Sequence, residues 1–129
     1  MNAEENVRGE MHAEVGEAEP VLDRARALER IGGDVVLLAE IARLFMEEYP
    51  TLLALIRRAC AAGDSHELER AAHSLKGAVA NFSAASTVHA ALMLERMARA
   101  GDLSQAQRAI ELLELELTRL EPELVELAR

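Results

Sequence analysis

The chain of 129 residues is poor in several residue types, and each shortage narrows the possible folds. Its only cysteine is Cys60, so no disulfide can form within it, which favours a reducing compartment. Aromatic residues make up 2% of the chain and tryptophan is absent, so a core must be built mainly from aliphatic side chains and Met. Only three prolines and seven glycines are present to interrupt a composition rich in good helix formers. These features predict an all-α protein.

The chain also lacks a basic, apolar start of signal-peptide type and any apolar run long enough to span a bilayer, which predicts a cytoplasmic protein. The net charge is -9, and residues 1–20 contain six acids and one base. Nucleic acids and anionic membranes need a basic face, so we expect neither as a partner. We predict a disordered acidic tail or linker over residues 1–19 and one folded domain over residues 20–129.

Within residues 20–129, apolar residues recur at spacings of three and four, as on the buried face of a helix. We expect a short helix over about 23–30 and then a long helix that ends at Ala62-Gly63. Asp34 should cap the long helix, and Pro50 should kink it or force a restart. Two further helices are expected over about 65–81, capped by Asp64 or Ser65, and about 84–100.

The last helix should begin at Ser104, because Gln107 three residues later completes a capping-box pattern, and Pro122 should bend or divide it. We interpret its apolar stripe as core, although it could also form the seam of a dimer. The stripe comprises Leu103, Ala106, Ile110, Leu113, Leu117, Leu120, Leu124 and Leu127. Short connections between substantial helices predict an antiparallel up-and-down four-helix bundle with a short additional N-terminal helix, and we expect a monomer.

The segment most informative about function is His73-Ser74-Leu75-Lys76-Gly77. On a helical wheel, the apolar neighbours form one face and His73 lies about 140° from its centre, towards solvent. An exposed imidazole offers a nucleophilic nitrogen near neutral pH, and Lys76 one turn on offers a positive charge for a phosphoryl group. Gly77 costs a helix about 1 kcal/mol relative to alanine, but it would let a partner approach the imidazole. No nucleotide-binding loop is evident, so partners must supply the catalytic machinery.

The same five residues match the H-[ST]-L-K-G signature of histidine-containing phosphotransfer (HPt) domains. The flanking sequence agrees with this resemblance over about residues 20–125. Matching stretches are Leu28-Glu29-Arg30-Ile31-Gly32-Gly33-Asp34, Leu44-Phe45 with Pro50, Ala62-Gly63-Asp64, Ala80-Asn81-Phe82-Ser83-Ala84, Leu94-Glu95 and Gly101-Asp102-Leu103. The chain therefore resembles the HPt family along nearly its whole length outside the acidic tail.

The resemblance implies a non-enzymatic phosphorelay carrier of two-component signalling. His73 would accept a phosphoryl group from a receiver-domain aspartate and pass it to a second receiver, Lys76 would assist electrostatically and Gly77 would give access. A second basic helper, often found shortly after the lysine in the family, is absent from positions 78–80. Expected partners are response-regulator receiver domains and a sensor histidine kinase, with no cofactor on this chain and Mg²⁺ held by the receiver. Candidates for receiver docking are Glu69, Ala72, Ala80, Phe82 and His66.

Two other functions remain open from the sequence. The chain could be the substrate domain of a chemotaxis-like histidine kinase, phosphorylated directly by an ATP-binding domain. It could also be an adaptor bundle that binds partners without carrying phosphate. A metal site is not expected, because Glu69 and His73 share a ligand-compatible spacing but no further ligand is evident.

Overall fold

The computed structural model describes residues 21–129, and every element in that range is helical. The predicted tail over residues 1–19 lies outside the described residues. The elements are α3 (Arg24–Arg30), α4 (Val35–Ala61), α5 (Ser65–Val79), η1 (Ala80–Phe82, a 3₁₀ turn), α6 (Ala85–Arg99) and α7 (Ala106–Ala128). No helix in the described part is long and apolar enough to cross a membrane.

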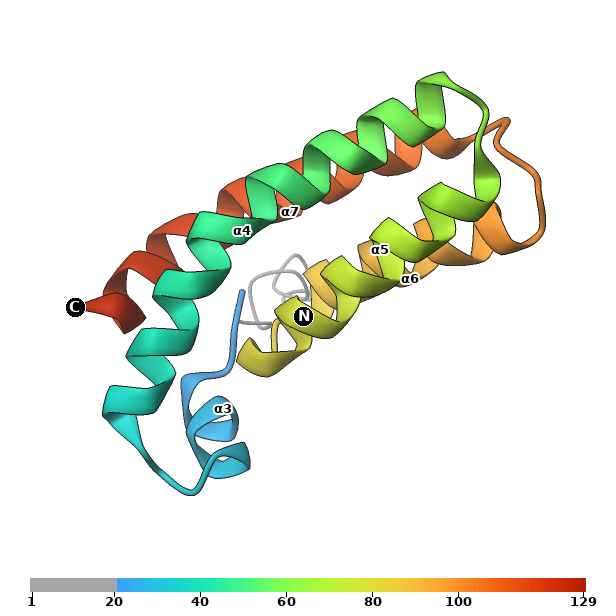
Figure 1. The fold of residues 1–129 in the computed structure, drawn as a ribbon. Helices are drawn as coiled ribbons and strands as arrows, with labels where there is room; N and C mark the ends of the chain where they lie inside the picture. Colours follow the sequence, from blue (N-terminus) through green and yellow to red (C-terminus); the bar gives the residue numbers. More distant parts are fainter. Residues whose placement is uncertain (1–20) are drawn as a thin grey trace, which may run out of the picture.

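Helices α4 to α7 form an up-and-down bundle (Figure 1). Each helix packs against the next one along the chain, and α7 closes the ring by packing against α4. The predicted helical bundle is therefore confirmed, and the short helix α3 lies across one end of it (Figure 1). Arg30 fixes α3 to the end of α5, because its guanidinium donates a hydrogen bond to the Ala80 carbonyl at 2.6 Å.

Aspartates start three of the helices, because their carboxylates accept hydrogen bonds from free N–H groups of the first turn. Asp23, Asp34 and Asp64 each bond the backbone N–H three residues later, at 3.0 Å. The prediction for Asp34 is confirmed, and Asp64 rather than Ser65 caps α5. Gly63, with φ +69°, makes the left-handed turn between α4 and α5.

Helix α7 begins at Ala106, two residues later than predicted. The prediction of a capping box at Ser104 and Gln107 is wrong, because no side chain caps this helix. The hydroxyl of Ser104 bonds the Asp102 carboxylate at 2.7 Å instead, so it does not cap the helix. Pro50 and Pro122 lie inside unbroken helices, so neither the restart at Pro50 nor a division of α7 occurs. Helix α4 does change direction partway along its length (Figure 1).

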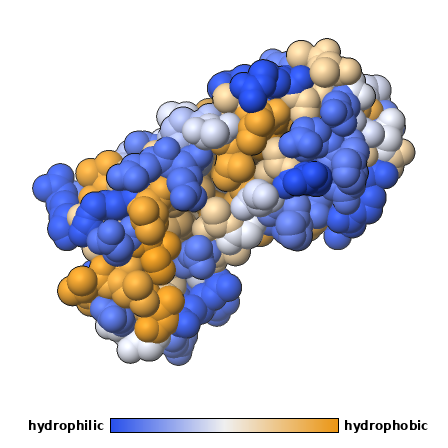
Figure 2. Space-filling model, in the orientation of Figure 1, coloured by the Kyte–Doolittle hydropathy of each residue, from blue (hydrophilic) through white to orange (hydrophobic). Residues whose placement is uncertain are grey.

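The core is aliphatic, as the shortage of aromatic residues predicts. The apolar stripe of α7 is buried from Ala106 onwards, and Phe82 is the largest fully buried side chain. Hydrophobic side chains also gather on the surface where α4 begins (Figure 2), where Val35, Val36 and Leu37 are exposed. The remaining exposed apolar side chains on α6 and α7 include Met93, Leu112 and Leu115.

Candidate functional site

His73 lies on the outer face of α5, in the middle of the helix. The opposite face of α5 is buried through Leu68, Ala72, Leu75 and Val79, as the helical wheel predicts. The side chain of His73 is 66% exposed. The imidazole is therefore accessible to a large partner from the solvent side.

A buried carboxylate from the neighbouring helix holds the inner side of this imidazole. Glu95 of α6 has a side chain only 3% exposed, and its Oε2 lies 2.9 Å from His73 Nδ1. Two cations share the same carboxylate. Lys76 Nζ lies 2.8 Å from Glu95 Oε1, and Arg99 Nη2 lies 2.9 Å from Glu95 Oε2. A buried negative charge is thus surrounded by groups that neutralise it.

The balance of these interactions keeps Glu95 ionised. Burial alone would raise the pKa of the Glu95 carboxyl, but hydrogen bonds and charge from Lys76 and His73 outweigh it, so that pKa falls below its ordinary value. An ionised carboxylate can only accept hydrogen bonds, so Nδ1 of His73 must carry the proton and donate it. In the neutral ring, Nε2 then has a free lone pair.

Nε2 is the ring nitrogen that Glu95 does not engage. Because Glu95 engages Nδ1 and no other described residue bonds Nε2, the lone pair of Nε2 is available to an incoming electrophile. The carboxylate also stabilises positive charge on the ring if Nε2 forms a new bond. The arrangement is suited to nucleophilic chemistry at Nε2.

Arg99 supplies a second cation near His73. Its Nε donates to Glu69 at 2.8 Å while its Nη2 donates to Glu95, so it bridges α5 and α6 beside the imidazole. The family pattern suggests a second basic helper shortly after the lysine, and positions 78–80 contain none. In space, a cation from α6 lies close to the histidine instead.

Gly77 has no close neighbour on its outer side. A Cβ built there would meet no atom within 4 Å beyond the adjacent backbone of its own helix. Packing within the described chain therefore does not require glycine at this position, and α5 would gain helix propensity from alanine. The space above Gly77 remains free for a partner that approaches His73.

The predicted docking residues fall into three groups. Glu69 and His66 line one shallow pocket with His73, together with Arg70, Ser74, Glu95 and Arg99. Ala80 is half-buried and lines a different pocket, beneath α3. Ala72 and Phe82 are fully buried, so their prediction as docking residues is wrong, because their side chains fill the core between the helices.

Sequence reasoning missed Glu95 as a site residue, although a signal was present. Glu95 falls on the buried stripe of its helix, between Ala91, Leu94 and Ala98. An acid at a core position is rare unless it is paired, so it points to a buried partner. Only the fold shows that this partner is the pair His73 and Lys76 on α5.

The polar groups of the site interact with one another rather than forming a metal site. Glu69 binds Arg99 and His73 binds Glu95, so the i,i+4 pair is not arranged as two ligands of one ion. Within residues 21–129, no three His, Cys, Asp or Glu side chains gather as a potential ligand set.

Comparison with protein families gives one match. The sequence model of the Hpt domain matches residues 40–123, which include every residue of the His73 site. Comparisons with curated proteins and with solved structures found no match. The family match covers well over half of the chain, and it agrees with the helical bundle and with an exposed histidine on its second long helix. The chain therefore belongs to the Hpt domain family, the phosphocarrier modules that perform histidine phosphotransfer in two-component signalling.

Proposed function

We propose that this protein is a phosphorelay intermediate that accepts a phosphoryl group on Nε2 of His73 from a receiver-domain aspartate and passes it to the aspartate of another receiver. One observation carries the proposal. His73 is exposed, and its inner nitrogen donates to a buried carboxylate, which leaves the outer nitrogen free as the nucleophile.

The transfer step can be written with all bonds accounted for. The Nε2 lone pair attacks the phosphorus of the aspartyl phosphate, so a P–N bond forms as the P–O bond to the aspartate breaks. The electron pair of that P–O bond leaves on the aspartate carboxylate. The Nδ1 proton stays in its hydrogen bond with Glu95, whose negative charge stabilises the positive charge that develops on the ring. The return step is the reverse of this reaction.

The cations beside His73 would balance the charge of the transferred group. Lys76 and Arg99 both contact Glu95, the carboxylate that also binds the imidazole of His73. Charge-assisted hydrogen bonds to phosphate oxygens are among the stronger ones. The Mg²⁺ ion and the residues that position the reacting phosphorus would come from the receiver, so the carrier itself needs no cofactor.

The test is phosphotransfer from a phosphorylated receiver domain to the full chain, with wild type and His73→Ala measured side by side. The readout is label on this chain that is stable to base and labile to acid. We expect label on the wild type and none on His73→Ala. His66→Ala is the matched control, because His66 lines the same pocket without contacting Glu95, and it should still accept label.

Two results would redirect the proposal. An unlabelled wild type with every receiver tried, although folded, would favour the adaptor function. Label obtained from an ATP-binding kinase domain but from no receiver would favour the substrate domain of a chemotaxis-like kinase.

A further inference from the structure

Arg99 is held by two carboxylates beside the His73 site, one from each of the helices α5 and α6. Its Nε donates to Glu69 of α5 at 2.8 Å, and its Nη2 donates to Glu95 of α6 at 2.9 Å. The side chain of Arg99 is nevertheless 62% exposed. A guanidinium has five N–H donors, and these two bonds use only two of them. Arg99 therefore has donors left for an anion that arrives from solvent.

The charged groups of this network balance one another before any phosphoryl group arrives. Glu69 and Glu95 contribute two negative charges, and Lys76 and Arg99 contribute two positive ones. Both cations are thus already engaged by carboxylates of the protein. A phosphoryl group on Nε2 of His73 adds negative charge, so it competes with these carboxylates for the two cations.

Of the two cations, Arg99 is the one that can leave its place at the lower cost. Its side chain is 62% exposed, whereas that of Lys76 is 25% exposed. Glu95 would stay compensated without Arg99, because Lys76 remains on its Oε1 at 2.8 Å. Glu69 would instead lose its only ion-pair partner among the described residues. The free-energy cost of releasing Arg99 therefore falls mainly on Glu69.

Glu69 is also the stronger of the two partners of Arg99. The hydrogen bond and the charge of Glu69 raise the pKa of the Arg99 guanidinium above its ordinary value, and they contribute more to this rise than Glu95 does. The side chain of Glu69 is 28% exposed, so water can solvate its carboxylate when Arg99 leaves. Ion pairs at the surface contribute little free energy, so this one can open when a competing anion arrives.

We propose that Glu69 is a positioning residue that withholds Arg99 from the phosphoryl group of His73 and so makes the phosphorylated protein less stable. This inference rests on the proposed function, because it concerns a phosphoryl group carried by His73. Glu69 bonds Arg99, whereas the ring of His73 bonds Glu95, so Glu69 acts through Arg99 and is not a reacting group. Its effect is to favour transfer from His73 to a receiver over transfer in the opposite direction.

The experiment measures the equilibrium of phosphotransfer between the full chain and one receiver. Glu69→Gln keeps the shape of the side chain and removes its charge. Arg99 should then stabilise the phosphorylated carrier, and the equilibrium should shift towards His73 by about two- to fivefold, the effect of one surface ion pair. Arg99→Gln should shift it towards the receiver. The effect of Glu69→Gln should disappear when Arg99→Gln is also present, because one residue acts through the other.

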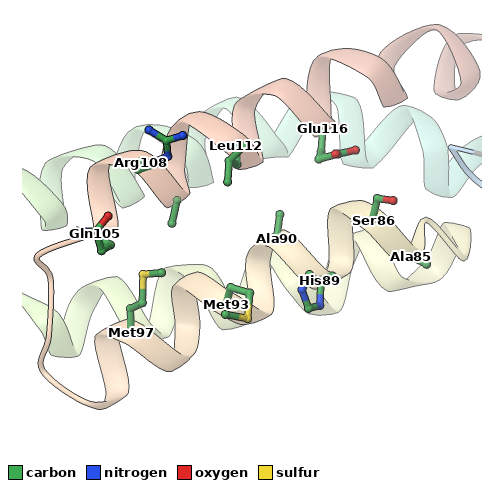
Figure 3. Close-up of a pocket in the computed structure, with 11 residues that line it drawn as sticks. Ala85, Ser86, His89, Ala90, Met93, Met97, Gln105, Arg108, Leu112 and Glu116 are labelled. Atoms are coloured by element: carbon green, nitrogen blue, oxygen red, sulfur yellow. The ribbon is translucent and has the colours of Figure 1, made fainter. Parts of the chain in front are cut away.

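Two control variants lie in the groove between α6 and α7, whose lining shares no residue with the pocket beside His73 (Figure 3). Glu116→Gln removes an acid that is also paired with an arginine, since Glu116 accepts a hydrogen bond from Arg119 at 3.0 Å. Arg108→Gln removes a cation from the same groove. Both should leave the equilibrium unchanged, which separates a local effect from a change in net charge. Thermal melts of each variant check that the bundle is folded.

A second measurement needs no receiver, so it separates a failure of this inference from a failure of the proposed function. Phosphoramidate is a small phosphoryl donor for histidine. Nε2 of His73 attacks its phosphorus, a P–N bond to the ring forms, and ammonia leaves with the electron pair of its own P–N bond. In ¹⁵N-labelled wild type, the Nε–H signal of Arg99 should move on phosphorylation, because this donor leaves Glu69. The signal should stay in place in His73→Ala treated in the same way.

Three results would overturn the inference. The first is an equilibrium in Glu69→Gln that equals the wild-type value or shifts towards the receiver, which would leave Glu69 as a structural link between α5 and α6. The second is a shift that persists in full when Arg99→Gln is also present. The third is an Arg99 signal that phosphorylation of His73 does not move. None of these results would contradict a phosphoryl group on His73, which the comparison with His73→Ala decides.

Discussion

Two hydrogen bonds in this bundle join a ring to a glutamate of another helix, and they differ in what surrounds them. Between α5 and α6, His73 Nδ1 lies 2.9 Å from Glu95. Between α4 and α7, the hydroxyl of Tyr49 donates to Glu121 at 2.5 Å. Both bonds tie together helices that pack side by side.

The two hydrogen bonds differ in the charges around the glutamate and in whether the ring has a second polar atom that faces solvent. Lys76 and Arg99 surround Glu95, and the charges of the site lower the pKa of its carboxyl against the effect of burial. Burial and the hydrogen bond to Glu121 instead raise the pKa of Tyr49 to about 12. His73 presents a second nitrogen to solvent, whereas Tyr49 is half-buried and has used its only polar atom. In the proposed function, the first bond therefore positions the nucleophile, whereas the second only joins α4 to α7.

Replacing Glu95 should show the difference between the two hydrogen bonds most clearly, because only the bond to His73 should affect phosphotransfer. Glu95→Gln keeps the shape of the side chain but removes the charge that holds Nδ1–H. We expect phosphotransfer to His73 to slow by about 10- to 100-fold, the cost found when a metal-binding histidine loses the partner that orients its ring. Rates from single-turnover transfer with a fixed receiver measure this effect. Glu121→Gln is the matched control on α4/α7, and an equal loss of rate in that variant would contradict the distinction.

Gly77→Ala should change stability and transfer in opposite directions. Alanine should raise the free energy of unfolding by about 1 kcal/mol, because it has the higher helix propensity and its methyl group would meet no atom of another element within 4 Å. Transfer should slow, since the added methyl group occupies space that a receiver needs near His73. Urea unfolding and transfer rates on the same preparation measure both. An unchanged transfer rate would mean that the partner does not approach over Gly77.

Tyr49→Phe should lower stability by about 1 kcal/mol without changing transfer, since it removes one hydrogen bond far from the nucleophile. The effect has a defined pH dependence. The pKa of Tyr49 is about 12 in the fold against 10.0 for the free side chain, so its contribution is complete below pH 10 and is lost as the pH rises towards 12. The difference in unfolding free energy between wild type and variant should shrink over that interval. A constant difference would show that the hydroxyl does not titrate in this way.

The sequence predicted the helices well because their signals are local. Asp34 caps its helix as expected, and the apolar stripe of α7 is buried. The failures come from competing interactions that spacing does not show. The hydroxyl of Ser104 donates its hydrogen bond to Asp102 instead of capping α7. Helix α4 continues past Pro50 because a proline removes only one backbone donor while the packing against α7 remains.

The site was predictable only in part. His73, Lys76 and Gly77 form a local motif on one helix, so they could be proposed as site residues from the sequence alone. Glu95 and Arg99 belong to another helix and act through contacts across the α5/α6 interface, which no spacing in the chain encodes. Ala72 shows the opposite error, since proximity to His73 in sequence placed a core residue among the docking candidates.

The most direct test of the account is nitrogen and phosphorus NMR of the full chain with ¹⁵N-labelled histidine, before and after phosphorylation by a receiver. Before phosphorylation, His73 should be protonated at Nδ1, with Nε2 unprotonated, and Glu95→Gln should disturb that preference. Afterwards, the ³¹P–¹⁵N coupling should appear at Nε2 of His73. Coupling at Nδ1, or at another histidine, would contradict the central claim that Glu95 holds one nitrogen so that the other carries the phosphoryl group.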